Sequence, residues 1–222
     1  MNELISLKNV SKSYNGNFNV LKSINICIEA NSITSIIGKS GCGKTTLLNI
    51  IGGLDLPTNG QVIVNGVNIT DLPEHSLNKF RSKNIGFVFQ FFNLIPELTV
   101  KENILFPAAI QKRKIEKDWI DYLIKITGLD KHLTKIPAQL SGGEQQRVAI
   151  IRALVGHPII VLMDEPTGNL DEENTHIVCG LIKKMKNELN QTIMLVTHDN
   201  DVSKIADQVI NMRDGKIGDC KK

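Results

Sequence analysis

The sequence predicts an α/β protein in which a mainly parallel sheet carries an N-terminal antiparallel β layer and an inserted helical segment. Three observations support this fold class. Short apolar runs bounded by turn signals recur along the chain, Asn-Gly pairs separate strand-like segments near the N-terminus, and a helical pattern fills the middle. We therefore expect a single domain, in which residues 1–90 and 159–222 form the core and residues 91–158 form a helical subdomain.

The antiparallel layer is indicated by two Asn-Gly pairs, which favour tight hairpin turns. The strand-like segment Ile5–Tyr14 leads into Asn15-Gly16. The second pair, Asn65-Gly66, lies between Gln61–Val64 and Val67–Ile69. These strands are expected to pack against a second layer.

That second layer is an alternation of buried strands and helices. Its predicted strands are short apolar runs between turn signals, which is typical of central strands in a parallel sheet. They are Ser32–Ile37, Ile85–Phe89, Ile159–Met163 and Ile193–Val196. The first of them ends in a glycine-rich loop.

Between Phe91 and Pro158 the pattern becomes helical. Thr99 and Glu102 have the spacing of a capping box at the start of a helix. A second apolar helix face follows, and Gly128 is expected to end that helix. The apolar residues are Ile104, Leu105 and Ala108 in the first helix, and Trp119, Ile120, Leu123, Ile124 and Ile126 in the second.

Composition excludes several functional classes. The chain has 222 residues, of which 41% are hydrophobic and 22% charged, as in globular proteins with a sizeable core. Its net charge of +3 predicts neither a nucleic-acid partner nor a polybasic membrane anchor. No apolar run approaches the roughly 20 residues of a membrane span, and the start MNELISLKNV lacks a signal pattern, so we expect a cytoplasmic location. The cysteines lack metal-ligand spacing and are expected to be free thiols: Cys27, Cys42, Cys179 and Cys220.

The glycine-rich loop carries the first functional motif. Residues 38–45, GKSGCGKT, match G-x-x-x-x-G-K-[ST] between a strand and a helix, which predicts a P-loop NTPase core that binds ATP and Mg²⁺. Glycines let backbone N–H groups turn toward phosphates, and the helix from Thr45 to about Ile51 directs its positive end at them. Lys44 can neutralise the β- and γ-phosphates, and the Thr45 hydroxyl can ligate Mg²⁺. The expected nucleotide ligands here are Gly38, Lys39, Ser40, Gly41, Cys42, Gly43, Lys44, Thr45 and Thr46.

Two acids follow the apolar run Ile159–Met163. Buried carboxylates at a strand end are costly without a cation or polar partners, and Asp164 suits a Mg²⁺ shell. Adjacent strand residues point opposite ways, so Glu165 is expected to face elsewhere and to polarise the attacking water. The alternative is a strand that ends in a polar turn. His198, after another apolar strand, could bond the γ-phosphate or the water, although a lone histidine there is more often structural.

A second helix start also has the features of an anion site. In Leu140–Arg147 the spacing of Ser141 and Glu144 is that of a capping box, which would explain those two residues alone. It does not explain Gly142 and Gly143, which leave backbone N–H groups exposed. Only the first helix start has the lysine and the Mg²⁺ ligands. We therefore expect the second to complete a nucleotide held by another copy of the chain, in a homodimer.

Taken together, these motifs are similar to those of ABC transporter ATP-binding subunits. The run LSGGEQQR resembles the signature of that family, and nearly the whole chain follows its order of motifs. The resemblance implies an active ATPase whose copies pair at least when ATP is bound. It also implies a separate integral membrane permease, which would hold the subunit at the inner face of the cell membrane. The implied roles are adenine stacking for Tyr14 (otherwise an edge-strand tyrosine), a link from Mg²⁺ to the permease for Gln90, contact across the dimer for Asp171, the switch histidine for His198 and the catalytic base for Glu165.

A narrower resemblance concerns the macrolide-export and lipoprotein-release branch of the family. It rests on Gly52–Thr58, Phe89–Pro96 and Pro166–Asp171. Glu144 replaces the glutamine of the most common signature, a variant that occurs in this branch. The branch implies that ATP-driven closure pulls on a permease that exports or extracts lipoprotein, peptide or macrolide-like substrates. Two or three apolar side chains around Gln90 are then expected to be exposed for the permease, and the alternative is that they belong to the core of the helical subdomain. The candidates are Phe89, Phe91, Phe92, Leu94, Ile95 and Leu98.

Three other functions compete with this interpretation. A cell-division-type regulatory ATPase would use the same catalytic residues without transport. A soluble ABC ATPase of ribosomes or DNA typically has two cassettes, coiled coils or zinc modules, which the sequence lacks. A generic P-loop kinase leaves Leu140–Arg147 and His198 without a role. The transported substrate stays open, because the permease would carry that specificity.

Overall fold

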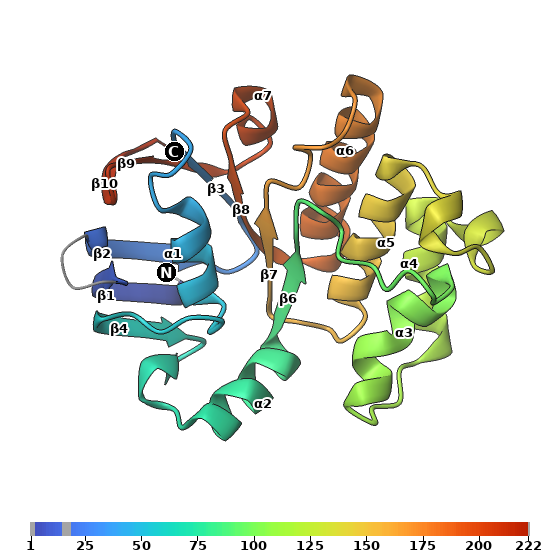
Figure 1. Cartoon of the computed structure of the whole chain (residues 1–222), viewed down its shortest axis with the longest axis horizontal. Coiled ribbons are helices and arrows are strands. Elements are labelled where there is room, and N and C mark those ends of the chain that lie inside the picture. Colours follow the sequence, from blue (N-terminus) through green and yellow to red (C-terminus); the bar gives the residue numbers. More distant parts are fainter. Residues whose placement is uncertain (1–2, 15–18, 222) are drawn as a thin grey trace.

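The computed structural model of the chain describes residues 3–14 and 19–221, and the predicted Asn15-Gly16 turn lies outside them. Within the described residues the chain forms two sheets, with helix α1 (Lys44–Ile51) between them (Figure 1). One sheet has the order β2-β1-β4-β5 and the other β10-β9-β3-β8-β7-β6. None of the described helices combines the length and the apolar character needed to cross a bilayer.

The larger sheet confirms the predicted parallel core. Strands β3 (Ile33–Ile37), β8 (Thr192–Thr197), β7 (Ile160–Asp164) and β6 (Ile85–Val88) run parallel to their neighbours. Strand β9 (Gln208–Arg213) is parallel to β3, and β10 (Lys216–Lys221) pairs with β9 in the antiparallel sense.

Both faces of this sheet are covered, which explains why its central strands are apolar throughout. On β7, Ile160 and Leu162 pack into the cluster that contains α1 and the antiparallel sheet. The alternate residues Val161 and Met163 pack into the cluster formed with α5 (Gly142–Leu154) and α6 (Glu172–Leu189). All four side chains are fully buried, so alternation along the strand serves two hydrophobic cores.

The antiparallel sheet consists of β1 (Glu3–Ser13), β2 (Asn19–Glu29), β4 (Asn59–Val64) and β5 (Val67–Asn68). Asn65 and Gly66 have φ of 49° and 76°, so the predicted hairpin turn is confirmed. The predicted strand Val67–Ile69 is one residue too long. The Asn68 side chain accepts a hydrogen bond from Thr70 N–H and starts a 3₁₀ turn at Ile69.

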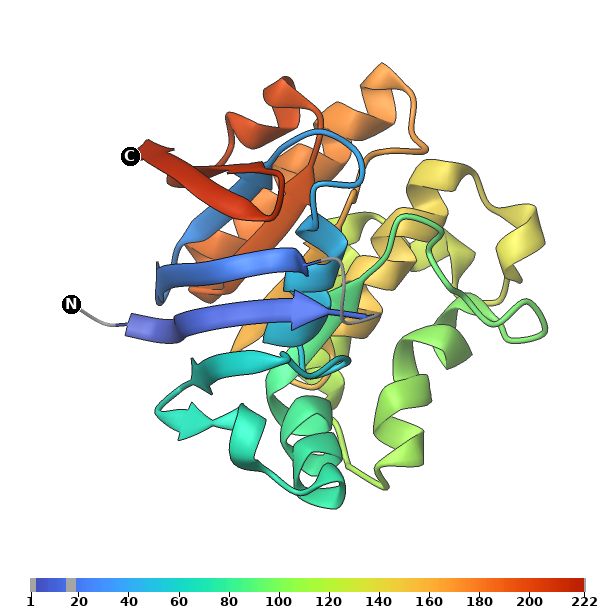
Figure 2. The same ribbon diagram turned by 60° about the vertical axis from the view of Figure 1, so that its left-hand side comes forward.

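The helical segment lies to one side of the sheet, with α3 (Val100–Ile110) and α4 (Lys117–Thr127) outside α5 (Figures 1 and 2). The Thr99–Glu102 capping box is present, and Gly128 ends α4 at φ 68°, as predicted. Helix α2 (Glu74–Asn84) precedes β6, and the short α7 (Asn200–Ser203) follows β8. The expectation of two or three exposed apolar side chains around Gln90 is wrong in number. Phe91 is 74% exposed, whereas the other five candidates are partly buried.

Asn103 on α3 anchors the segment that joins β6 to this helix. Its side chain is fully buried. It accepts a hydrogen bond from Ile95 N–H at 2.8 Å and donates to the carbonyls of Ile95, Leu98 and Thr99 at 3.0, 3.0 and 3.1 Å. We expect Asn103→Ala to lower the free energy of unfolding by about 3 kcal/mol, because partly buried backbone groups lose these partners and the fully buried site loses its side-chain amide.

Urea unfolding followed by circular dichroism measures that change. Asn187→Ala is the matched control, because Asn187 is exposed on α6 and should contribute less than about 0.5 kcal/mol. Equal losses in the two variants would contradict the anchoring role of Asn103.

Candidate nucleotide-binding site

One cavity of about 540 Å³ collects motif residues from distant parts of the chain. It lies where β3, β7 and β8 end, the edge at which α/β sheets bind ligands. It is lined by Val20, Ser40, Gly41, Gly43, Lys44, Thr45, Thr46, Gln90, Asp164, Glu165 and His198. The side chains predicted to bind phosphate, to ligate Mg²⁺ and to act on water therefore face one space.

The loop between β3 and α1 requires glycine at two places. Gly43 has φ 105°, and a Cβ there would come within 3.0 Å of the Val20 carbonyl oxygen. At Gly38 a Cβ would come within 2.3 Å of the Met212 carbonyl oxygen. Since no side chain caps the start of α1, its first backbone N–H groups are available to an anion.

Three of the predicted loop ligands do not line the cavity: Gly38, Lys39 and Cys42. Cys42 packs its thiol into the core, and its backbone is bonded, with Cys42 N–H donating to Lys39 and Gly215 N–H donating to Cys42. Lys39 is exposed. The cysteines Cys27, Cys42 and Cys179 are free thiols, as expected.

Lys44 sits at the base of the loop with its ammonium facing inward. The residue is buried, and Nζ donates to the carbonyls of Gly38 at 2.7 Å and Lys39 at 3.2 Å. These neutral carbonyls hold the charge beside the free N–H groups of α1. Phosphate oxygens would be stronger partners for it, because charge-assisted hydrogen bonds exceed neutral ones.

Thr45 and Asp164 meet across the cavity, where Thr45 Oγ1 donates to Asp164 Oδ1 at 3.2 Å. Burial raises the pKa of Asp164, and the neighbouring charge of Glu165 raises it further, against the opposing effects of Thr45 and Lys44. The ionised form of Asp164 is therefore disfavoured, and a bound divalent cation would stabilise it. The described part of the chain has no group of three or more His, Cys, Asp or Glu that could hold a metal ion alone. This donor set fits Mg²⁺, which keeps water and phosphate among its ligands.

Glu165 and His198 form a pair at the opposite wall. His198 Nδ1 lies 3.0 Å from Glu165 Oε1, and His198 backbone N–H donates to Glu165 Oε2 at 3.3 Å. The Glu165 side chain is only 15% exposed. Its φ of 45° is unusual for a residue other than glycine, and such backbone strain gathers at functional sites. Asp164 and Glu165 thus have different partners, as strand alternation suggested, although the left-handed backbone after β7 produces the separation.

Gln90 follows β6 and is tied to the segment after Glu165. Asn169 Nδ2 donates to the Gln90 carbonyl at 2.9 Å, and Gln90 Nε2 lies 3.5 Å from Asn169 Oδ1. This contact joins residues 79 positions apart, so no local sequence pattern could have indicated it.

Tyr14 and Asp171 lie outside the cavity. The Tyr14 ring is 57% exposed, its hydroxyl donates to Asp55 at 2.9 Å, and Lys12 Nζ is 4.8 Å from the ring centroid. Asp171 caps α6 by accepting a hydrogen bond from Asn174 N–H at 2.8 Å. Both side chains are open to a ligand or to a second copy.

The second predicted anion site also lies outside the cavity. Ser141 and Glu144 form the expected capping box at the start of α5. A Cβ at Gly143 would come within 1.8 Å of Asn174 Oδ1, so packing against α6 requires this glycine. A Cβ at Gly142 would meet nothing closer than 3.5 Å. Packing within the chain therefore explains Gly143 but not Gly142, which leaves Gly142 as the position where a ligand can approach the helix start.

Comparison with known proteins is consistent with this geometry. A family model described as ABC transporter matches residues 21–168. Two curated relatives are lipoprotein-releasing system ATP-binding proteins LolD. The one from Cytophaga hutchinsonii is 42% identical and covers 98% of this chain and 100% of its own. The one from Bacteroides thetaiotaomicron is 43% identical over 96% of this chain and 99% of its own. A solved dimer of the ATP-binding cassette MJ0796 in a post-hydrolysis state with ADP and Pi is 40% identical, with a TM-score of 0.89 over 99% of this chain and 98% of that chain.

Proposed function

Because this chain belongs to the ABC transporter family and hydrolyses ATP, we propose that two copies close around MgATP and thereby drive a separate membrane permease. One observation carries the proposal. A single cavity holds the phosphate loop, Asp164, Glu165 and His198, whereas the helix start at Ser141 lies outside it. A second copy can supply that helix start to the open side of the nucleotide, and the dimeric cassette MJ0796 supports such pairing.

In this mechanism the chain's own groups position ATP and the attacking water. The α1 N-terminus and Lys44 bind the β- and γ-phosphates. Glu165, held by His198, accepts a proton as water attacks the γ-phosphorus, and the bond to the bridging oxygen breaks to give ADP and phosphate. Mg²⁺, held by Thr45, Asp164 and Gln90, would neutralise charge on the phosphate oxygens.

The second copy completes the site. Its Ser141 hydroxyl and Gly142 N–H would donate to the γ-phosphate, and its Asp171 would lie at the contact between copies. Tyr14 would stack on the adenine. ATP holds the copies together because its phosphates contact both, and hydrolysis removes that difference in affinity. The helical segment 91–158 would then turn with the permease.

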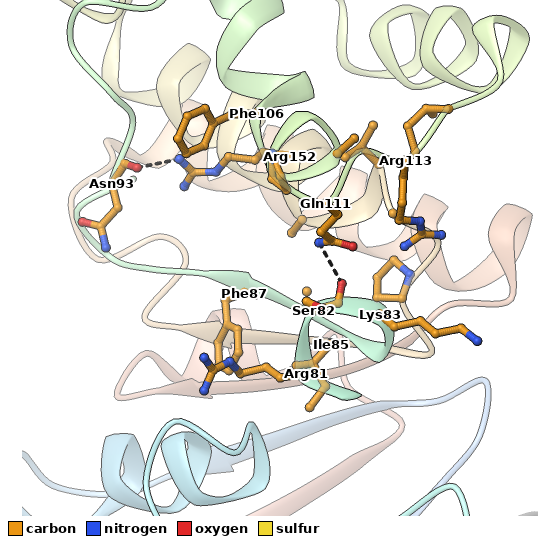
Figure 3. A pocket seen from close by; sticks show the side chains of 18 of the residues that line it. Arg81, Ser82, Lys83, Ile85, Phe87, Asn93, Phe106, Gln111, Arg113 and Arg152 are labelled. Atoms are coloured by element: carbon orange, nitrogen blue, oxygen red, sulfur yellow. Dashed lines mark hydrogen bonds between the residues drawn. The ribbon is translucent and has the colours of Figure 1, made fainter. Parts of the chain in front are cut away.

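A groove beside Gln90 supports a protein contact of defined charge. It encloses about 390 Å³ between α2 and β6 on one side and α3 and α5 on the other. Figure 3 shows Phe87 and Phe106 on its walls, and Gln111 bonded across it to Ser82 at 3.1 Å. Its described lining includes four cations and no acid: Arg81, Lys83, Arg113 and Arg152. We propose that it receives a cytoplasmic segment of the permease that carries apolar and acidic side chains.

The names of the relatives favour lipoprotein release as the function of the complex between this subunit and its permease. Membrane lipoproteins are therefore the first substrate class to test. The subunit would then act at the inner face of the cell membrane through its permease. The division-type alternative shares the site chemistry and differs in the membrane partner.

Charge reversal of the groove tests the partner. Lys83 and Arg113 are exposed, whereas Arg152 is occupied by the carbonyls of Phe92 and Asn93. We expect Lys83→Glu/Arg113→Glu to lose more than about 90% of the permease that the parent retains from detergent-solubilised membranes, as quantified by mass spectrometry. ATPase activity of the isolated subunit should not change.

Lys112→Glu/Lys114→Glu is the matched control, because both lysines are exposed but do not line the groove. It should keep the permease. Equal retention by all three proteins would rule out the groove, and retention of a division complex in place of a permease would favour the regulatory function.

A further inference from the structure

Glu144, the acid of the signature segment, has both carboxylate oxygens occupied. Its Oε2 accepts a hydrogen bond from Ser141 N–H at 2.6 Å. Its Oε1 lies 3.2 Å from His132 Nε2, and the two side chains are 20% and 21% exposed. Since a carboxylate only accepts hydrogen bonds, the histidine must carry its hydrogen on Nε2. The capping box therefore has a third member, which comes from another part of the chain.

His132 is held by its surroundings. It ends the 3₁₀ turn Asp130–His132 between α4 and α5, and its N–H donates to the carbonyl of the fully buried Leu129 at 2.9 Å. Lys135 N–H donates to the His132 carbonyl at 2.9 Å, and Val100 N–H donates to the Lys135 carbonyl at 2.8 Å. These hydrogen bonds connect the turn to the start of α3. They fix the backbone of His132 and thereby the position from which its imidazole bonds to Glu144.

A carboxylate at this helix start creates an electrostatic problem. Burial alone would raise the pKa of Glu144, but the backbone and hydroxyl of Ser141 and the nearby His132 and Lys135 hold that pKa below its usual value. An ionised Glu144 would repel a phosphate that approaches the same helix start. The donors Ser141 N–H and His132 Nε2 disperse the negative charge of the two carboxylate oxygens and fix the orientation of the carboxylate.

The same arrangement prepares Ser141 for a ligand. Ser141 Oγ accepts a hydrogen bond from Glu144 N–H at 3.2 Å, so the hydroxyl hydrogen stays free to donate. Glu144 occupies Ser141 N–H, which leaves the N–H of Gly142 as the next donor at the helix start. The position of both donors depends on where Glu144 is held.

We propose that His132 is a positioning residue that acts through Glu144 and sets Ser141 and Gly142 for the γ-phosphate of ATP bound by a second copy. The inference rests on the proposed pairing of copies around ATP. It assigns His132 to the ATP-dependent contact between copies and not to nucleotide binding within one copy.

Two substitutions separate the hydrogen bond from the mere presence of a polar side chain. His132→Gln places an amide N–H₂ near the position of Nε2, whereas His132→Asn places it near Nδ1, out of reach of Glu144. In a Glu165→Gln background we expect His132→Asn to raise the MgATP concentration for half-maximal pairing by about tenfold, the loss of one hydrogen bond to a charged group. His132→Gln should stay within about threefold of the parent.

Pairing is measured by size exclusion with light scattering, and binding within one copy by fluorescence of a methylanthraniloyl-ATP at protein concentrations too low for pairing. The affinity for the labelled nucleotide within one copy should be the same in all variants. His132→Ala replaces His132→Asn if circular dichroism shows that the latter is unfolded. Equal pairing by the Asn and Gln variants, or weaker binding within one copy, would overturn the inference.

Glu144→Ala completes a double-mutant cycle, because alanine cannot bond to His132. If His132 acts through the carboxylate, His132→Asn should cost less than about twofold when Glu144→Ala is already present. A cost of about tenfold in both backgrounds would show that His132 acts elsewhere. If the parent fails to pair at any MgATP concentration, the proposed function itself is wrong, and the role of His132 falls with it.

Discussion

Glu165→Gln is expected to lower kcat for ATP hydrolysis by about a thousandfold and to leave ATP affinity within about threefold. Glutamine has nearly the same shape and can still accept the hydrogen bond from His198 N–H, but it cannot accept a proton from water. Release of inorganic phosphate gives kcat, and fluorescence of a labelled nucleotide gives the affinity.

Loss of hydrolysis should also trap the closed pair. We expect the Glu165→Gln variant to be a monomer without nucleotide and a dimer with MgATP, as measured by size exclusion with light scattering. Glu74→Gln on α2 makes the same chemical change at an exposed position away from the cavity and should hydrolyse ATP like the parent.

Two outcomes would contradict this account. Hydrolysis by Glu165→Gln at close to the parental rate would mean that another group takes the proton, with His198 as the nearest candidate. A monomer with ATP demonstrably bound would mean that two copies do not pair around ATP, which would contradict the proposed function and the contact of the Ser141 helix start with the nucleotide.

The predicted strands and the unpredicted ones differ in how they are buried. Strands β7 and β8 are covered on both faces, so every residue is apolar or nearly so and the run is visible in the sequence. Strand β2 buries alternate residues, and polar residues such as Lys22 and Ser23 interrupt the pattern. The amphipathic helix α6 begins with a polar stretch, Glu172–His176, so its apolar periodicity is not apparent at the start of the helix. An element that is buried on one face only therefore has a weaker hydrophobic pattern in the sequence than one that is buried on both faces.

In the candidate site, some features are local in sequence and others depend on contacts between distant segments. The phosphate loop, the acids at the end of β7 and the Ser141 capping box are each contiguous in sequence, because each motif lies within one short stretch of backbone. Contacts between Gln90 and Asn169 and between His132 and Glu144 arise only when segments from different elements meet. Their chemistry is visible in neither segment alone. The left-handed backbone of Glu165 likewise follows from how the chain leaves β7.

Lys44→Met is expected to weaken ATP binding by about a hundredfold, because the ammonium is the buried positive side chain beside the free N–H groups of α1. Methionine is unbranched like the lysine stem and only lacks the terminal ammonium position, so the loss reports the charge and its hydrogen bonds. Lys39→Met removes the same charge from the same loop at an exposed position that does not line the cavity.

Isothermal titration calorimetry measures the ATP affinity of the two variants. It distinguishes attraction by the net charge of the loop from direct contact between Lys44 and the phosphates. If the loop attracts ATP only through its net positive charge, both substitutions should weaken binding equally and added salt should remove the difference from the parent. If Lys44 contacts the phosphates directly, Lys39→Met should bind ATP within about threefold of the parent, and the loss in Lys44→Met should persist at high salt. The free protein already holds the Lys44 ammonium on the carbonyls of Gly38 and Lys39, so the donor is in place before the nucleotide arrives. That preorganisation favours direct contact, and a loss of less than about threefold in Lys44→Met would rule it out.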